Sequence, residues 1–399
     1  MKLRVGYGKT GSQSISPYNS FYDYGQIVDY ASPTGVKVMA IGVSNLQNSD
    51  LKWETTSAYN TGLDFTFWKG KLSGTIDAYY KETNDLLIEK NLPASTAFGT
   101  ITMNQGSLSN KGLELSLASE LVNKKDLNWS ISGNIGVNRS KIIDLGLPET
   151  QFGSEFYKAY LGNSIGDHFG SANIFIVGKA PGLFWGYKTD GIIQTGDTSP
   201  TSAIFSQTPG NIKVVDVNGD GVINVNDKTI IGNPNPDFNY GFQTAFEYKQ
   251  FRFSAAFYGV KGGDVLNGNI RYEQTPSLQT SNMISEAFNG AWRANAPSDL
   301  FPAINSVLQN VVYDRYVEDA SFLRCSDITL GYTFPKTTFN NKIGNLNLFA
   351  SVKNAFLVTG YSGYDPEMRT FSFDGLRPGV DLNSYSNPRQ FILGLNVTF

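Results

Sequence analysis

Hydrophobic and polar residues alternate along much of the chain, which is the pattern of a β-strand with one apolar face. In the segment FILGLNVTF, residues 391–399, every second position is Phe, Leu or Val, and the positions between them include Gly, Asn and Thr. The segments WSISGNIGVN at 129–138 and LSGTIDAYY at 72–80 repeat this alternation. Similar patterns occur at 3–7, 63–67, 113–117, 238–246, 251–257, 328–334 and 346–352. We expect about ten antiparallel strands, most of them long enough to cross a bilayer at a tilt.

The connections between these strands alternate between short and long. The short ones are 68–71, 122–126, 249–250 and 335–342, and the long ones are 10–51, 88–107, 141–237, 262–321 and 355–388. An outer-membrane barrel has short periplasmic turns and long extracellular loops. Trp68, Trp129 and Tyr248 lie beside three of the short connections, where a girdle of interfacial aromatic residues is expected. The pattern predicts an all-β, antiparallel transmembrane barrel with its long loops at the outer end.

The polar positions of these strands predict a wet interior. They include several charged and amide side chains, which a dry core would not accommodate: Asp64, Asp77, Glu114, Asn134, Gln243 and Asp327. The alternative is a secreted, soluble all-β carbohydrate-binding module with a dockerin-like structural calcium loop. Such a module needs polar outward faces, whereas here an apolar face recurs from strand to strand.

Composition limits the other classes of function. The chain of 399 residues has 41 Gly, 21 Tyr and 27 Phe with only 17% charged residues, which suits a β protein. The formal net charge is −3 and there is no basic patch, so we expect no nucleic-acid partner. No apolar run is long enough for a helical membrane span. The single cysteine, Cys325, excludes a disulfide within the chain.

The sequence gives no support for catalysis. His168 is the one histidine, its neighbour Asp167 adjoins it in sequence, and no G-x-S-x-G motif is present. The carboxylate pairs Glu318 with Asp319 and Asp365 with Glu367 are interpreted as solvated surface charges rather than a glycosidase site. We expect no enzymatic activity. Loop aromatics can stack on sugars or pack loop against loop, and packing is favoured; they are Tyr18, Phe21, Tyr24, Tyr157, Tyr160, Phe184, Trp185, Tyr361 and Tyr364.

The segment DVNGDGVINVND, residues 216–227, has the spacing of the EF-hand calcium loop. A hard cation such as Ca²⁺ prefers oxygen ligands, and Gly221 allows the turn that brings them together. The expected ligands are the side chains of Asp216, Asn218, Asp220, Asn224 and Asp227 and the backbone carbonyl of Val222. Asp227 stands where Glu is usual, as in dockerin-like loops. The other interpretation is a Gly-rich hairpin tip. We expect structural calcium within segment 209–232 of the outer loop 141–237.

Seven stretches in one order carry a resemblance to a known family. They are KLRVGYGKTGSQ, NSDLKWETTSAYNTGLDF, FWGYKTDGIIQ, DVNGDGVINVNDKTIIGNPNPDFNYGF, YVEDASFLRCSDITLGYTFP, SVKNAFLVTGYSGYDPE and NPRQFILGLNVTF. With them the chain resembles, over nearly all of its length, the C-terminal half of the SusC/RagA-type TonB-linked outer-membrane transporters of Bacteroidetes-like bacteria.

The resemblance implies that residues 1–399 are about ten C-terminal strands of a plugged barrel of about 22 strands. It also implies a SusD-like lipoprotein over the extracellular face and import of large nutrients, glycans or oligopeptides, with energy passed on by TonB. The plug, the TonB-contacting segment and a signal peptide are absent from this sequence, so we expect a fragment that does not transport alone. The expected location is the outer membrane, in contact with its lipid, with Phe399 at the end of the assembly signal.

Overall fold

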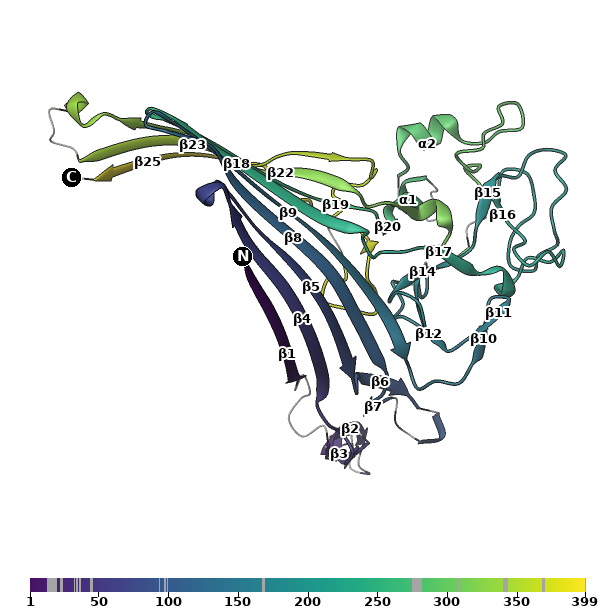
Figure 1. The fold of residues 1–399 in the computed structure, drawn as a ribbon. Coiled ribbons are helices and arrows are strands. Elements are labelled where there is room, and N and C mark those ends of the chain that lie inside the picture. Colours follow the sequence, from purple (N-terminus) through teal and green to yellow (C-terminus); the bar gives the residue numbers. More distant parts are fainter. Residues whose placement is uncertain are drawn as a thin grey trace.

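In the computed structural model, ten strands form a single antiparallel sheet within the described residues. Those residues are 1–12, 20–21, 24–31, 33, 35, 37–43, 46–92, 94–96, 98, 100–166, 169–274, 282–307, 309–339, 344–367 and 370–398. The ten strands lie side by side in chain order, and Figure 1 shows them as a curved sheet. They are β1 (Lys2–Ser12), β4 (Glu54–Phe67), β5 (Leu72–Asn84), β8 (Ser107–Lys124), β9 (Leu127–Asp144), β18 (Phe238–Tyr248), β19 (Phe251–Lys261), β22 (Phe322–Phe334), β23 (Asn345–Thr359) and β25 (Gln390–Thr398). The predicted strands are therefore confirmed.

Several strands are longer than the alternation indicates. The pattern predicts a strand at 113–117, but β8 begins at Ser107 and pairs with β9 as far as Asp144. Residues 107–112 read SLSNKG and have no clear apolar face. The outer part of β8 is held by backbone hydrogen bonds to β9. Such bonds do not depend on side-chain polarity, so an alternating sequence pattern does not reveal them. Phe399, expected to share the apolar face of β25, lies outside the described residues.

Two of the short connections contain residues in the left-handed backbone region. Between β4 and β5, the turn η1 (Trp68–Gly70) has φ of 52° at Trp68, 56° at Lys69 and 94° at Gly70. Between β18 and β19, Lys249 has φ of 54°. In η1, the successive residues with positive φ match the right-handed twist of a β-hairpin. These turns fix the register of each strand pair.

The long connections leave the sheet at its other end, and they fold rather than loop freely (Figure 1). Two of them contain hairpins, formed by β2 (Tyr24–Ala31) with β3 (Lys37–Val43) and by β6 (Leu87–Asn91) with β7 (Thr100–Asn104). The described parts of 145–237, 262–321 and 360–389 pack together, and we call them the loop body. Its elements are β10 (Thr150–Phe152), β11 (Glu155–Tyr157), β12 (Ala159–Leu161), β13 (Asn173–Ile176), β14 (Leu183–Gly186), β15 (Thr189–Ile192), β16 (Ile212–Val214), β17 (Thr229–Gly232), β20 (Asp264–Asn267), α1 (Asn269–Gln274), α2 (Ser285–Gly290), β21 (Val317–Asp319) and β24 (Val380–Asp381).

The largest buried apolar cluster of the described residues lies in this loop body and not in the sheet. It joins side chains from all three connections, among them Phe184 and Tyr187, Leu266 and Tyr313, and Val380. Backbone hydrogen bonds link the same segments: β20 pairs with β21 and, in parallel, with β24, and the Tyr187 N–H donates to the Val312 carbonyl at 2.9 Å. Burial of these side chains supplies the main driving force for ordering the loop body. Among the described residues, no helix is both long and apolar enough to span a membrane.

Candidate functional site

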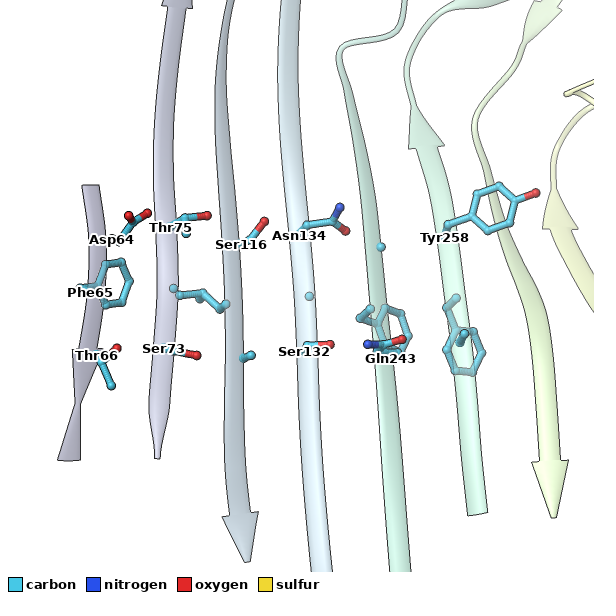
Figure 2. Close-up of a pocket in the computed structure, with 18 of the residues that line it drawn as sticks. Asp64, Phe65, Thr66, Ser73, Thr75, Ser116, Ser132, Asn134, Gln243 and Tyr258 are labelled. Carbon is cyan, nitrogen blue, oxygen red and sulfur yellow. The ribbon is translucent and has the colours of Figure 1, made fainter. Parts of the chain in front are cut away.

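One face of the ten-stranded sheet is lined by polar side chains. The register places Asp64 opposite Thr75, Thr75 opposite Ser116, and Ser116 opposite Asn134. Figure 2 shows this row of side chains across neighbouring strands, with Tyr258 further along. They line a pocket of about 740 Å³. The other residues predicted for a wet interior, Asp77, Glu114, Gln243 and Asp327, lie on the same face in the paired register.

Three of the carboxylates on this polar face, Asp64, Asp77 and Asp327, have partners. The Arg4 guanidinium lies 2.8 Å from a carboxylate oxygen of Asp64 and 2.8 Å from one of Asp77. Both Thr329 Oγ1, at 2.8 Å, and Ser351 Oγ, at 2.9 Å, donate to the Asp327 carboxylate. The Arg4 pairs are partly exposed, so they add little stability. These contacts hold the polar side chains in fixed positions. The result is a hydrophilic surface that offers hydrogen-bond partners to a solute.

The opposite face is apolar and exposed. It carries Leu3, Val5, Ile76, Leu113, Leu117, Ile131, Phe242, Phe253, Leu330, Leu393 and Leu395. Leu393 in β25 is 77% exposed. Trp68, Trp129 and Tyr248 lie at the short-turn end of this sheet, and Trp129 Nε1 donates to Thr244 Oγ1 at 2.9 Å. An exposed apolar surface of this extent indicates contact with lipid or another apolar phase. The predicted sidedness of the strands is therefore present in the structure.

A buried ion cluster joins the polar face to the last long connection. The Arg324 side chain is 4% exposed and that of Asp365 is 2% exposed, with 2.6 Å between Arg324 Nη2 and Asp365 Oδ1. Arg324 Nε lies 2.9 Å from Glu367 Oε2, which also accepts a hydrogen bond from Tyr258 Oη at 2.7 Å. The interpretation of Asp365 as a solvated surface charge is wrong. The loop in which it lies turns back onto the sheet, and Arg324 compensates the cost of burying its charge.

The segment 216–227 wraps around its own side chains. The Asp216 carboxylate accepts the N–H groups of Gly219 at 2.8 Å and Gly221 at 2.7 Å. Asn218 Oδ1 accepts the N–H of Asp220 at 3.0 Å, and Asp220 Oδ1 accepts that of Val222 at 2.8 Å. The side chains expected as ligands thus line one continuous turn. Each carboxylate or amide oxygen has two lone pairs, so one that accepts a single N–H can still bind a cation.

Asp227 has a structural role that the sequence pattern did not assign. Its side chain is fully buried. One oxygen accepts the Val217 N–H at 2.9 Å, and the other accepts the Asn224 N–H at 2.8 Å. With Asn224 it forms a capping box at the short helix η3 (Val225–Asp227). Within the described residues no group of three His, Cys, Asp or Glu side chains can hold a metal. The expected site takes ligands from Asn and a carbonyl as well, so calcium here stays a prediction.

The comparison with known proteins decides the family. The family model described as "TonB dependent receptor-like, beta-barrel" matches residues 1–355. The chain belongs to this family. TonB-dependent receptor P26 of Formosa agariphila is 31% identical over 408 residues, which cover 100% of this chain and 40% of that protein. TonB-dependent receptor SusC of Bacteroides thetaiotaomicron is 31% identical over 413 residues, which cover 100% of this chain and 37% of that protein.

Among solved structures, the RagAB peptide transporter is similar. It matches with a TM-score of 0.78 and 25% identity over 100% of this chain and 40% of that chain. This TonB-dependent receptor chain thus spans about two fifths of the length of the relatives that it matches. The comparisons confirm the resemblance to SusC/RagA-type transporters and the fold class. Members of the family are outer-membrane transport proteins and not enzymes. The polar face of the receptor sheet is accordingly the lumen wall, and the apolar face is the lipid-facing side.

The sequence alone did not find Arg324 as a lumen residue of the receptor. Ile328, Leu330, Tyr332 and Phe334 are apolar positions of β22, and alternation would place Arg324 with them. A β-bulge lies between Cys325 and Asp327, where the register with β19 and β23 shifts. Because the bulge adds one residue, it turns Arg324 to the opposite face, beside its cross-strand partner Tyr258. Arg324 and Asp327 are polar residues three positions apart in β22. This odd spacing, which breaks the period of two, was the one indication in the sequence that the strand contains a bulge.

Most of the described loop aromatics pack inside the receptor's loop body. Phe184, Trp185 and Tyr361 are buried, and the Tyr160 ring stacks on Phe175 at 4.8 Å between centroids. Phe21, Tyr24 and Tyr364 are exposed, and Tyr157 is partly buried. Tyr18 lies outside the described residues, as do Asp167 and His168, the residues considered for catalysis.

Proposed function

We propose that this chain forms part of the barrel of a TonB-dependent outer-membrane transporter that imports large nutrients, glycans or oligopeptides. The observation that carries the proposal is the sidedness of the ten-stranded sheet. Its apolar side chains are exposed on one face, and the register aligns hydroxyl, amide and charged side chains on the other. A barrel in a bilayer requires this division. The secreted carbohydrate-binding module is not favoured, because the family model covers residues 1–355.

The transport function belongs in this proposal to a longer receptor polypeptide. The relatives that the chain matches are much longer, with 40% and 37% of their lengths covered. The strands β1 and β25 form the two edges of the described sheet. Open edges of this length are an aggregation hazard, and further strands would close them. A plug and a TonB-contacting segment in the remainder would supply energy coupling.

We extend the proposal to a SusD-like lipoprotein partner over the outer face. One relative is the TonB-dependent receptor SusC, and one similar solved structure is the RagAB peptide transporter. The loop body offers an ordered outer surface for such a partner, because its three connections share one core. The proposal covers glycan and oligopeptide cargo; the similarity to the RagAB peptide transporter supports the oligopeptide class.

The proposal also keeps structural calcium in the loop 216–227. Its support is the spacing of Asp216, Asn218, Asp220, Val222, Asn224 and Asp227 and the continuous turn on which the first three side chains lie. Extracellular calcium modules bind with Kd of roughly 10⁻⁴–10⁻³ M, so the ion would hold the loop in shape rather than act as a sensor.

The test of transport is energy-dependent uptake. Cells that produce the receptor should accumulate fluorescently labelled oligosaccharides or oligopeptides, and a protonophore that removes the inner-membrane energy source should abolish the accumulation. A lipid-anchored partner should copurify with the receptor in detergent. Accumulation that persists unchanged in the presence of the protonophore would contradict TonB-coupled import.

A further inference from the structure

The last long connection of the receptor returns to the lumen wall before it joins the outer loops. Its residues Asp365 and Glu367 bind Arg324 on β22, at 2.6 and 2.9 Å. The Glu367 N–H also donates to Asp365 Oδ1 at 3.0 Å, so the turn presents both carboxylates together. From the far end of the connection, Asn387 Nδ2 lies 3.5 Å from Asp365 Oδ2. Both ends of the connection therefore meet at the wall.

The middle of the same connection is tied to the loop body. In β24, Val380 lies beside Leu266 of β20 in a parallel pair, and the Leu266 N–H donates to the Gly379 carbonyl at 2.9 Å. Arg377 Nη1 donates to the Ser164 carbonyl at 3.1 Å, and Asn173 Nδ2 donates to that of Pro378 at 3.1 Å. The connection thus links the lumen wall to the outer structure at two separate places.

The wall contact lies within the lumen. Glu367 borders a pocket of about 420 Å³ together with Glu114, Asn134 and Tyr258, which all belong to the polar face. The Glu367 side chain is 28% exposed, so it still faces this space. Ser132, which lines the neighbouring pocket of about 740 Å³, lies two residues along β9 from Asn134 towards the short-turn end. A loop held at Glu367 therefore stands between the outer surface and the wall around Ser132.

We propose that Arg324 is a positioning residue for cargo passage, which fixes the last outer loop against the inner wall so that this loop narrows the lumen. The inference rests on the proposed function, since it takes the barrel interior as the cargo path. Arg324 suits this role because its guanidinium binds two carboxylates in a set geometry. Loss of one partner of a buried pair leaves an uncompensated charge, so the loop would leave the wall when Arg324 is replaced.

The experiment measures access to the lumen from outside. In the full receptor, Ser132→Cys provides a thiol on the wall, and intact cells are treated with a small impermeant maleimide or with a polyethylene-glycol maleimide. The native Cys325 is fully buried, so it should react little with either reagent. Labelling of the receptor that lacks Ser132→Cys measures this background from Cys325. Arg324→Met should raise the ratio of the labelling rate with the bulky reagent to that with the small reagent by at least about tenfold. This is a conservative value, because loss of one partner of a buried ion pair ordinarily shifts a local equilibrium by more than tenfold.

Two further variants separate positioning from folding. Arg252→Met is the matched control, because Arg252 is an exposed arginine on the same face that binds Glu247, far along the sheet from this loop. The labelling ratio of Arg252→Met should equal that of the parent. Combining Arg324→Met with Asp365→Asn and Glu367→Gln removes the buried charges together, so the receptor should assemble normally while the ratio stays raised.

The outcomes have distinct meanings. A parental ratio in both Arg324 variants, with normal labelling by the small reagent, would overturn the role of Arg324 and leave the transport proposal standing. A return of the ratio to the parental value in the combined variant would show that Arg324 serves folding alone. Absence of small-reagent labelling in every variant would show that the wall around Ser132 is closed to solutes from outside, so the loop at Glu367 could not control access to it and the inference would fall; the uptake experiment tests the transport proposal separately.

Discussion

Single side chains in this receptor gain their roles from neighbours that are distant in sequence. Asp227 occupies the last position of the calcium-loop pattern, yet its buried carboxylate caps backbone N–H groups. Arg324 reaches the lumen because a bulge shifts the alternation of β22 by one residue. The polar interior positions such as Asp64 and Gln243 were predictable, since period-two alternation is a local property. Arg324 and Asp365 were not, because bulges and buried pairs depend on strand partners that the alternation does not specify.

The calcium proposal makes a prediction for the loop 216–227. Asp216→Ala removes one proposed ligand and also the acceptor for the Gly219 and Gly221 N–H groups. Addition of EDTA to the parent should increase cleavage of this loop by an added protease, and excess Ca²⁺ should reverse the effect. In Asp216→Ala cleavage should be high with or without Ca²⁺. Cleavage of the parent that does not respond to EDTA would contradict an ion in the loop, and the Asp216 hydrogen bonds alone would then explain the variant.

Asp264 provides a pH-dependent prediction in the loop body. Burial raises the pKa of the Asp264 carboxyl, the carboxylates of Asp319 and Asp237 raise it further, and the Asn233 N–H opposes them. A raised pKa means that the folded state holds the proton more tightly, so this group's contribution to stability falls as pH rises from about 4 towards neutrality. Asp264→Asn should therefore increase the protease resistance of the loop body more at about pH 8 than at about pH 4. Asp190→Asn, at an exposed position of the loop body, controls for the loss of one negative charge. Equal increases in protease resistance at the two pH values in Asp264→Asn would contradict the raised pKa of Asp264.

At the scale of elements, the long strands of the sheet were predictable and the short strands of the loops were not. The membrane-crossing segments show sidedness because water and lipid lie on their two faces. Elements such as β14 (Leu183–Gly186) and β24 (Val380–Asp381) have too few residues for a periodic signal. They pair with segments far along the chain, as Val380 does with Leu266. Their ordering follows from the shared core, which no local window of sequence reveals.

The turn η1 gives a matched test of strand connection. Lys69 has φ of 56°, a conformation that costs a non-glycine residue free energy, whereas Lys71 has φ of −67°. Lys69→Gly should raise the free energy of unfolding by about 0.5–1 kcal/mol, and Lys71→Gly should lower it by a similar amount. Urea unfolding of the receptor in lipid vesicles measures both. A loss of stability in Lys69→Gly as large as that in Lys71→Gly would contradict strain at this turn.

At the scale of the whole molecule, two environments act on one sheet. Adjacent residues of β8 illustrate this: the register places Ser116 opposite Thr75 on the polar face, and Leu117 lies on the apolar face. The sidedness of this wall followed from the sequence. The loop body did not, since its connections were expected only as long loops, and its interior combines residues from about 165 to 380 of the chain. A core that is assembled over such distances carries no periodicity to detect.

Leu117 and Ser116 supply the matched pair that tests the orientation of the wall. Leu117→Arg places a charge towards lipid and should cost roughly 2–4 kcal/mol near the bilayer midplane, whereas Ser116→Arg faces the lumen and should cost much less. The free energies of unfolding in vesicles and the amounts assembled in the outer membrane measure this difference. Equal losses for the two variants would contradict the assigned faces.

The shared interior of the loop body limits how related receptors can diverge. A graft that replaced only residues 262–321 with those of a relative would bring in foreign counterparts of Leu266 and Tyr313, which contact side chains contributed by two recipient segments. Such a hybrid would have a mismatched centre and a disturbed outer surface. Recombination that preserves a working receptor should therefore exchange the three segments as a set, while substitutions that accumulate singly should be confined to the exposed rim.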